Sequence, residues 1–420
     1  MSIISPSIAV VGSGPSGCYL AQALRKTWPD SEVSVFESEP VPFGLLRYGI
    51  AADHQGSKSV AMQFDRLFRR DGVNFFGNVT IGRDLPFERL TQSFDVVAIA
   101  TGLARDLALP VPQDPKANVV GAGEILRALN GYPEPRLPND GGRFHSLGES
   151  LAIVGHGNVA VDVARLLAKR IEQFDNSDID DDRVSMLRSG QPERIHLIGR
   201  SSAAEAKFDL SMLSELCALD HVKVSASGLS DDDQSEKAVI VRNAARRTVT
   251  AEPPVEIAFH FEYAPVQVDA LGTKSVLRGY SKANGIVSFH VDTVVTAIGF
   301  TDEIGNIGAR CETWSAPNVF RVGWVKNGGK GGVAANRKDA QAVAAQIVTA
   351  VRDGALQVGR PGLVALGEQL PVDYVRYAGW LEVDRYERNA AGPNRLRKKI
   401  TDRELLLKVA RSDLNLEVSR

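Results

Sequence analysis

A glycine-rich turn near the start of the chain carries the first residues with a recognisable chemistry, Gly12-Ser13-Gly14-Pro15-Ser16-Gly17. It follows an apolar run of mostly β-branched residues, 8–11, and precedes a segment, 18–25, whose apolar residues recur at helical spacing. Strand, glycine turn and helix in this order form the dinucleotide-binding fingerprint, in which the backbone approaches a pyrophosphate closely. Glu37 ends the next apolar run, 32–36, where a carboxylate can accept hydrogen bonds from a ribose diol. These residues predict a dinucleotide site.

A second turn of the same kind stands in the middle of the chain, Gly155-His156-Gly157-Asn158-Val159-Ala160. It follows a strand-like run, 151–154, and opens into a helical pattern, and alanine at its third small position still permits close helix packing. Two fingerprints predict two bound dinucleotides. The alternative is one bound dinucleotide and a second fingerprint that is a relic and no longer binds one. Arg200 follows the strand-like run 194–198, where an NAD enzyme carries an acid. The arginine can pair with a 2′-phosphate, or it is an ordinary surface arginine.

Two further loops contain candidate functional residues. The glycine-rich loop 323–332 lacks bulk, which suits close backbone approach, and the helix predicted over 340–351 points its N-terminus back at this loop. The loop 42–54 holds two glycines, a proline and His54. It is either a surface loop held by Phe43 and Leu45 or a loop along a flavin, with His54 at the reacting ring.

The remaining pattern alternates helices and strands. We predict helices over 58–70, 122–129 and 403–409, and strands over 73–76, 79–81, 94–100, 194–198, 238–241, 255–263, 275–280, 286–290, 291–297 and 319–322. Residues 175–193, which include five aspartates, are interpreted as a solvated connection, and the aromatic-rich tail 372–420 as packing onto the first domain. Strands 94–100 and 291–297 each end at a small-residue turn, which indicates that the chain leaves the first domain after one and returns after the other.

The composition is that of a folded globular protein and excludes several functional classes. The chain has 420 residues, of which 44% are hydrophobic and 24% charged, so two or three domains are expected. A net charge of −2 gives no bulk attraction to nucleic acid or to an acidic membrane. The cysteines Cys18, Cys217 and Cys311 are too far apart for a redox dithiol or a zinc site, and no metal is expected. The early first strand and the short apolar runs predict neither a signal peptide nor membrane insertion, which favours the cytoplasm.

Several segments together identify a family. They read GSGPSG, PFGLLRYGIAADH, GHGNVAVDVARLL, GRSSAAEAKF, TAIGF and GWVKNGGKGGVAANRKDAQ, followed by YAGW and RLRKK in the tail. In this order they resemble the adrenodoxin reductase type of ferredoxin–NADP reductase over essentially the whole chain. The 42–54 segment and the loop that begins at Gly323 are the most specific to that family and its amidotransferase-associated relatives.

The resemblance implies which residues hold which cofactor. It implies FAD at the first turn, with Glu37 on its ribose, and places these residues at the FAD site: Gly12, Gly14, Pro15, Ser16, Gly17, Leu45, Val79, Trp324, Gly331, Gly332 and Val333. It implies NADP(H) at the second turn and places these residues there: Gly155, His156, Gly157, Asn158, Val159, Arg200 and Ser201, with Gly331 also near the nicotinamide. His54 matches the family's active-site histidine, and Glu215 falls where the family has a carboxylate near the nicotinamide, so both are predicted catalytic residues. Ser201 stands where the family has a second phosphate-binding arginine, and Met212 stands where it has another glutamate. We therefore expect a weaker preference for NADPH over NADH than is typical of the family.

The resemblance also implies the architecture and the reaction. We expect an α/β fold of two Rossmann-like dinucleotide-binding domains, one inserted in the other, with an FAD domain over 1–106 and 299–420 and an NAD(P) domain over 107–298. Hydride would pass from NADPH to FAD, and single electrons from FAD to an acidic iron–sulfur ferredoxin that feeds an oxygenase or a similar system. The ferredoxin is predicted to dock on Arg242, Arg246, Arg247 and the basic run 395–399. The alternative is a flavin-dependent monooxygenase or another NAD(P)H–flavin oxidoreductase, whereas a flavin disulfide reductase would need the dithiol that the cysteine spacing excludes.

Overall fold

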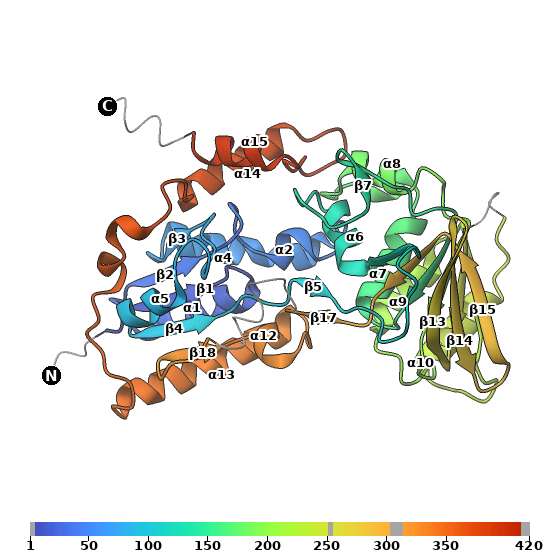
Figure 1. The fold of residues 1–420 in the computed structure, drawn as a ribbon, viewed down its shortest axis with the longest axis horizontal. Coiled ribbons are helices and arrows are strands. Elements are labelled where there is room, and N and C mark those ends of the chain that lie inside the picture. The colour runs from blue at the N-terminus through green and yellow to red at the C-terminus, as the bar shows by residue number, and fades with distance from the viewer. Residues whose placement is uncertain (1–4, 251–254, 303–313, 413–420) are drawn as a thin grey trace. The chain divides into compact units, whose positions relative to one another are not determined.

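The computed structural model describes residues 5–250, 255–302 and 314–412 (Figure 1). The chain divides into two compact units, one made of residues 1–105 and 300–420 and the other of residues 106–299. Cys18 and Cys217 are buried free thiols, and Cys311 lies outside the described residues. In the part of the chain that the structure describes, no helix is long and apolar enough to cross a bilayer.

The first unit is built on a parallel sheet of five strands in the order β18-β4-β1-β2-β3. The strands are β1 (Ile8–Val11), β2 (Val33–Phe36), β3 (Asn74–Phe76), β4 (Val96–Ile99) and β18 (Val319–Arg321). β1, β2 and β4 are buried along their whole lengths. Continuous apolar runs are typical of parallel strands that are covered on both faces.

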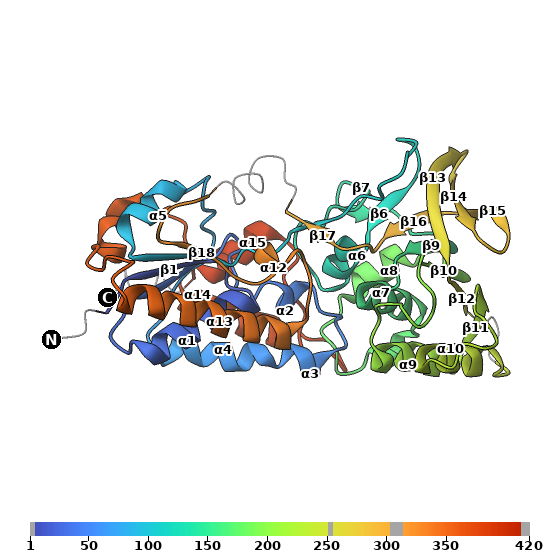
Figure 2. The same cartoon turned by 90° about the horizontal axis from the view of Figure 1, so that it is seen from below.

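Helices cover both faces of this sheet. The helices described in the first unit are α1 (Pro15–Thr27), α2 (Leu45–Tyr48), α3 (Gln55–Lys58), α4 (Val60–Arg69), α5 (Phe87–Ser93), α12 (Trp324–Asn327), α13 (Val333–Arg352), α14 (Tyr377–Asn389) and α15 (Arg403–Ala410). Figure 2 shows α1, α4 and α13 on one side of the sheet and α5 on the other. The segment that contains α14 also pairs with the sheet edge, because Gly77 and Val375 exchange backbone hydrogen bonds of 2.8 Å.

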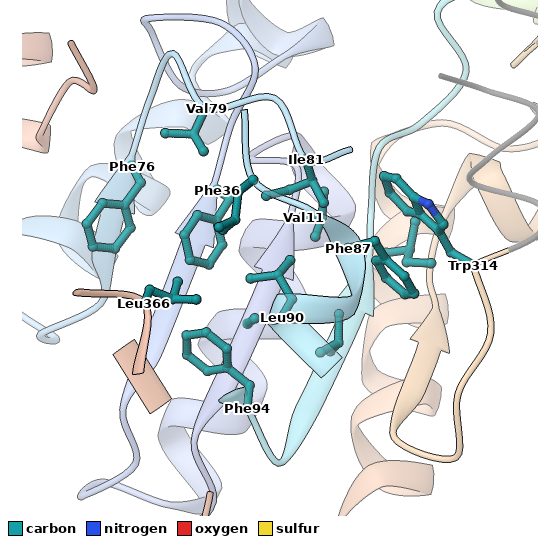
Figure 3. Packing of buried hydrophobic residues seen from close by; sticks show 14 residues of the cluster. Val11, Phe36, Phe76, Val79, Ile81, Phe87, Leu90, Phe94, Trp314 and Leu366 are labelled. Carbon is teal, nitrogen blue, oxygen red and sulfur yellow. The ribbon is translucent and has the colours of Figure 1, made fainter. Parts of the chain in front are cut away.

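A buried aromatic cluster fixes the carboxyl end of β2 (Figure 3). Phe36 stacks on Phe76 with ring centroids 5.2 Å apart, and Phe94 meets Phe36 edge-on at 6.1 Å. Phe87 of α5 stacks on Trp314 at 4.6 Å in the same cluster. Because Glu37 follows Phe36 directly, this packing sets where the Glu37 carboxylate can lie.

The second unit contains a parallel six-stranded sheet in the order β11-β12-β10-β9-β16-β6 and an antiparallel sheet β13-β14-β15. The strands of the larger sheet are β6 (Val119–Gly121), β9 (Ser150–Val154), β10 (Arg194–Ile198), β11 (Val222–Ser227), β12 (Val255–His260) and β16 (Thr293–Thr296). The others are β13 (Tyr263–Leu271), β14 (Lys274–Ser281), β15 (Gly285–Val291) and the hairpin β7 (Asn139–Asp140) with β8 (Arg143–Phe144). The helices are α6 (Ala122–Leu129), α7 (Asn158–Ala168), α8 (Asp181–Leu187), α9 (Leu210–Ala218) and α10 (Glu236–Ala245). Short strands β5 (Arg105–Asp106) and β17 (Phe300–Thr301) pair where the chain passes from one unit to the other.

The predicted strand over 238–241 is wrong, because these residues lie in α10. The Ser235 side chain accepts a hydrogen bond of 3.3 Å from the N–H of Ala238 and so caps the helix. The helix buries Ala238, Val241 and Ala244, which are three residues apart. A short apolar run carries no period of its own, so the cap was the signal that could have identified the helix.

Three other predictions about chain segments need correction. Residues 175–193 are not simply solvated, because Asp178 and Asp180 are buried and Asp180 caps α8 by accepting a 3.0 Å hydrogen bond from the N–H of Arg183. The segment 79–81 forms only an isolated bridge between Ile81 and Leu85. Helix α13 begins at Val333 rather than at Ala340, so it starts directly at the end of the glycine-rich loop.

Candidate functional site

The first glycine turn joins β1 to α1 and uses its glycines for different reasons. Gly12 has φ +106°, and a Cβ there would lie 2.5 Å from the Ala100 carbonyl oxygen. A Cβ on Gly17 would lie 2.1 Å from the Gly12 oxygen. Gly14 has open space where its Cβ would be, and Pro15 starts the helix immediately after it. The turn is therefore closely packed at Gly12 and Gly17 and open at Gly14, at the N-terminus of α1. This opening fits an approaching pyrophosphate.

Glu37 is bonded to this turn. Its Oε2 accepts hydrogen bonds from the N–H and the hydroxyl of Ser13, at 2.9 and 2.6 Å, and its Oε1 accepts one from the Glu39 N–H at 3.1 Å. The N–H of Val79 donates to the Glu37 carbonyl at 2.8 Å, so Val79 lies beside it. Glu37 is 9% exposed, and these hydrogen bonds fix the orientation of its carboxylate. Sequence reasoning assigned Glu37 to a ribose but missed that it also fastens the glycine turn to the end of β2.

The loop 42–54 lies on the same turn. The N–H of Phe43 donates to the Ser13 hydroxyl at 3.1 Å, and a Cβ on Gly44 would be 3.3 Å from the Gly14 Cα. Leu45 opens α2 directly after this contact, and half-buried His54 precedes α3. The structure therefore places the start of this loop, at Phe43 and Gly44, against the turn that carries the first fingerprint.

The glycine-rich loop 323–332 also reaches the first turn. A Cβ on Gly323 would lie 2.0 Å from the Ser16 hydroxyl oxygen. The Gly323 N–H donates to Asp339 at 2.7 Å, and the Trp324 indole N–H donates to the Gly331 carbonyl at 2.8 Å. These bonds hold the loop in shape and carry Gly331, Gly332 and Val333 with it. The residues predicted around the flavin thus gather in one unit.

The second glycine turn repeats the construction of the first. Gly155 has φ +138°, and a Cβ there would lie 2.3 Å from the Ala297 carbonyl oxygen. Gly157 has open space at its Cβ position, and α7 begins at Asn158, followed by half-buried Val159. Ala160 fills the third small position and is fully buried. The same combination of a packed first glycine and an open second glycine fits a second pyrophosphate.

His156 turns its side chain into the interior rather than toward the open side of the turn. Its ring packs against Phe208 and Phe261, and Nε2 lies 3.2 Å from the Leu197 carbonyl oxygen. A Cβ on Gly199 would be 2.4 Å from its Nδ1, so the ring occupies the space that this glycine leaves. Burial lowers the pKa of His156 to about 4, and the imidazole is neutral at pH 7. The backbone of His156, not its imidazole, is the part available at the turn.

Arg200 and Ser201 lie in a segment that is tied to the second turn. The N–H of Lys207 donates to the His156 carbonyl at 2.8 Å. Asn158 and Asp209 form a reciprocal pair, in which the Asn158 amide donates to the Asp209 carboxylate and the Asp209 N–H donates to the Asn158 oxygen, both at 2.7 Å. Arg200 is exposed. The N–H of Gly155 also donates to the carbonyl of Ile198 at 2.8 Å, which places the end of β10 beside the predicted pyrophosphate turn.

Glu215 lies on α9 and pairs with α7. Its Oε1 lies 2.9 Å from Nη1 of Arg165 and 3.7 Å from Nζ of Lys169. Arg165 is fully buried and also bonds Asp162 at 2.9 Å. The structure therefore gives Glu215 a local partner within its own unit, and its catalytic role stays a prediction. Sequence reasoning missed Arg165, because a charged residue on a helix ordinarily faces water.

Comparisons with known proteins agree with this geometry. Residues 6–204 match the family described as pyridine nucleotide-disulphide oxidoreductase. Cindoxin reductase of Citrobacter braakii is 37% identical over 97% of this chain and 92% of its own length. The mitochondrial NADPH:adrenodoxin oxidoreductase of Drosophila melanogaster is 30% identical over 96% of this chain and 93% of its own. The chain belongs to the adrenodoxin reductase type of ferredoxin–NADP reductase.

Structural similarity extends over the same length in this reductase family. FprA of Mycobacterium tuberculosis, solved in complex with NADPH, is 25% identical and superposes with a TM-score of 0.84 over 96% of this chain and 99% of its own. The predicted family, the α/β fold class, the oxidoreductase class and the cofactor pair FAD and NADP(H) are thereby confirmed. Within the described residues, no cluster of three or more His, Cys, Asp or Glu side chains could hold a metal ion.

Proposed function

We propose that this chain is a ferredoxin–NADP reductase that passes electrons from NADPH through FAD to an iron–sulfur ferredoxin. One observation carries the proposal: two glycine turns of matching construction occur in one chain, and the family's 42–54 loop and glycine-rich loop both lie on the first. When bound, FAD supplies the conversion between a two-electron hydride donor and a one-electron acceptor.

The protein's part in this reaction is to bind and orient. The open N-terminus of α1 would hold the FAD pyrophosphate, and the fixed Glu37 would accept from its ribose. In the second unit, the turn at Gly157 and the exposed Arg200 would hold the pyrophosphate and the 2′-phosphate of NADPH. We propose that His54 and Glu215 lie near the reacting rings, as the family resemblance implies.

The test of this function is anaerobic reduction followed by turnover. The purified protein should be yellow, NADPH should bleach its flavin, and cytochrome c reduction should rise when a ferredoxin is added. NADPH should be preferred to NADH with measurable NADH activity. Rapid oxygen consumption coupled to an organic substrate would instead indicate the monooxygenase alternative, and a flavin that NADPH does not bleach would refute both.

We propose that the ferredoxin is acidic, and hydrogen bonds and ion pairs within the protein already occupy some of the arginines proposed to dock it. Arg242 and Arg247 donate to backbone carbonyls of their own unit, and Arg397 pairs with Asp384 and Glu387. Arg246 is exposed and leads the remaining candidates. Charge steering predicts that the rate of ferredoxin reduction falls as salt rises, since the field is screened within about 8 Å at physiological ionic strength. A salt-independent rate would exclude this docking mode.

The predicted cytoplasmic location stays a prediction, and cell fractionation with an antibody to the native protein would test it.

A further inference from the structure

A buried ionic cluster joins the loop 42–54 to the last part of the first unit. Arg47, on α2 within that loop, pairs with Glu387 on α14, 340 residues away in sequence. Their side chains are 4% and 0% exposed. Nothing in the proposed reaction uses either residue, so the reason for placing two charges away from water has to be sought in what they hold.

Glu387 accepts hydrogen bonds from several donors. Besides Arg47, its carboxylate accepts from the Ile400 N–H at 3.0 Å and from Nη1 of Arg397 at 3.2 Å. Its backbone carbonyl accepts from the Lys398 N–H at 2.9 Å. The carboxylate is therefore fixed by the tail itself, before Arg47 is considered.

Arg47 is held on its other sides by aromatic rings. Its guanidinium carbon lies 4.8 Å from the centroid of the Tyr48 ring and 5.0 Å from that of Trp380 on α14. Trp380 also meets Phe43 edge-on at 5.8 Å. The tail thus contacts the loop at Phe43, next to its bond with Ser13 of the glycine turn, and at Arg47, inside α2.

We propose that Glu387 is a positioning residue of the flavin site, which acts through Arg47 to hold residues 43–54 against the first glycine turn. The assignment rests on the proposed function in that this loop, with Leu45 and His54, is taken to face the flavin. It makes the tail part of the cofactor site although no tail residue belongs to either fingerprint. A guanidinium fork between a carboxylate and two rings defines one orientation, which a lysine ammonium would not reproduce.

The substitution Arg47→Met separates this role from mere attachment of the tail. Glu387 would keep Arg397 and the Ile400 N–H, so the tail remains fastened while the loop loses its anchor. Tyr377→Phe is the control on the same helix: it removes the 2.8 Å hydrogen bond from Tyr377 to Asp65 of α4 and keeps the ring that stacks on Phe68, while the Arg47–Glu387 pair is unaltered. Glu387→Gln removes the charge that both arginines use.

Hydrogen exchange on the flavin-loaded protein is the decisive measurement. In Arg47→Met and Glu387→Gln, amides of 43–54 should exchange roughly 10-fold faster or more, the visible circular dichroism of the flavin should change, and Tyr377→Phe should match the wild type in both. The rate of flavin reduction by NADPH should fall with little change in the KM for NADPH, since that nucleotide binds in the other unit. Arg47→Lys should be intermediate, and it provides the comparison if the stronger variants do not fold.

Wild-type exchange in 43–54 in these variants, or equal effects in Tyr377→Phe, would overturn the proposal. The exchange comparison does not depend on turnover. A wild-type flavin that NADPH does not reduce would therefore refute the proposed function while leaving the anchoring of 43–54 open to the same measurement.

Discussion

The same substitution placed two residues apart should separate folding from cofactor binding. Gly12→Ala adds a methyl group that would lie 2.5 Å from the Ala100 carbonyl oxygen, on a backbone with φ +106°. Gly14→Ala adds the same group at φ −67°, an ordinary conformation for alanine, and nothing in the protein lies within 4 Å of it. The methyl group of Gly12→Ala therefore clashes with the backbone. The methyl group of Gly14→Ala occupies the space that a pyrophosphate would need.

The two expected costs differ in kind. A residue forced into a sparsely populated conformation costs about 1–3 kcal/mol, and the backbone contact adds to it. At about 2–4 °C per kcal/mol for a unit of this size, Gly12→Ala should lower the Tm of the flavin-free protein by roughly 5–10 °C. Gly14→Ala should leave that Tm within about 2 °C. It should instead weaken charge-assisted hydrogen bonds to phosphate worth about 1.5–3 kcal/mol, which is roughly 10- to 100-fold in the Kd for FAD.

Both quantities can be measured on protein stripped of flavin, by thermal unfolding and by titration with FAD followed by quenching of flavin fluorescence. Gly157→Ala, at the equivalent open position of the second unit, is the control, because it should leave FAD affinity unchanged. Wild-type FAD affinity in Gly14→Ala, or an unaltered Tm in Gly12→Ala, would refute the reasoning.

Three other outcomes are expected. Glu37→Ala should release flavin on extensive dialysis, because both the ribose acceptor and the anchor of the glycine turn are lost; full retention would contradict the assignment. Arg200→Ala should raise the KM for NADPH roughly 10- to 100-fold and barely change that for NADH, and Ser201→Arg should widen the preference; unchanged constants in Arg200→Ala would make it an ordinary surface arginine. Stability should fall as the pH drops from about 6.5 to 4, since unfolded histidine binds a proton that buried His156, with a pKa of about 4, does not. The loss from His156 should reach about 3 kcal/mol, and denaturant unfolding of His156→Asn should show a shallower dependence on pH.

Local chemistry was predictable from the sequence, and long-range partners were not. The strand, turn and helix around Gly12 and Gly155 are specified by neighbours in sequence, so their place and purpose could be stated in advance. Ala100 and Ala297, whose carbonyl oxygens exclude a Cβ from those glycines, directly follow strands that are distant in sequence and carry no signal of their own.

Side-chain direction could not be predicted from the sequence. His156 sits in a fingerprint, yet Phe208, Phe261 and Gly199 draw its ring inward. The ion pair of Glu215 with Arg165 was likewise not predictable, because only the packing of α9 on α7 brings the two residues together, and the predicted place of Glu215 near the nicotinamide stays a prediction. Helix α10 was not predicted because its apolar run is short, and the capping Ser235 was the sequence signal that could have identified it.

The division of the first unit into two stretches of chain bears on how the protein is made. Residues 106–299 leave the ribosome as one continuous block and can fold before synthesis ends. The other unit cannot: strand β18, the loop 323–332 and Glu387 all emerge after that block. Residues 1–105 must therefore wait across nearly two hundred intervening residues for β18 and for Trp314 and Leu366, which complete the cluster around Phe36. A ribosome stalled near residue 380 would hold a complete second unit and a first unit that lacks Glu387, and FAD should bind such complexes more weakly than it binds the full-length chain after release.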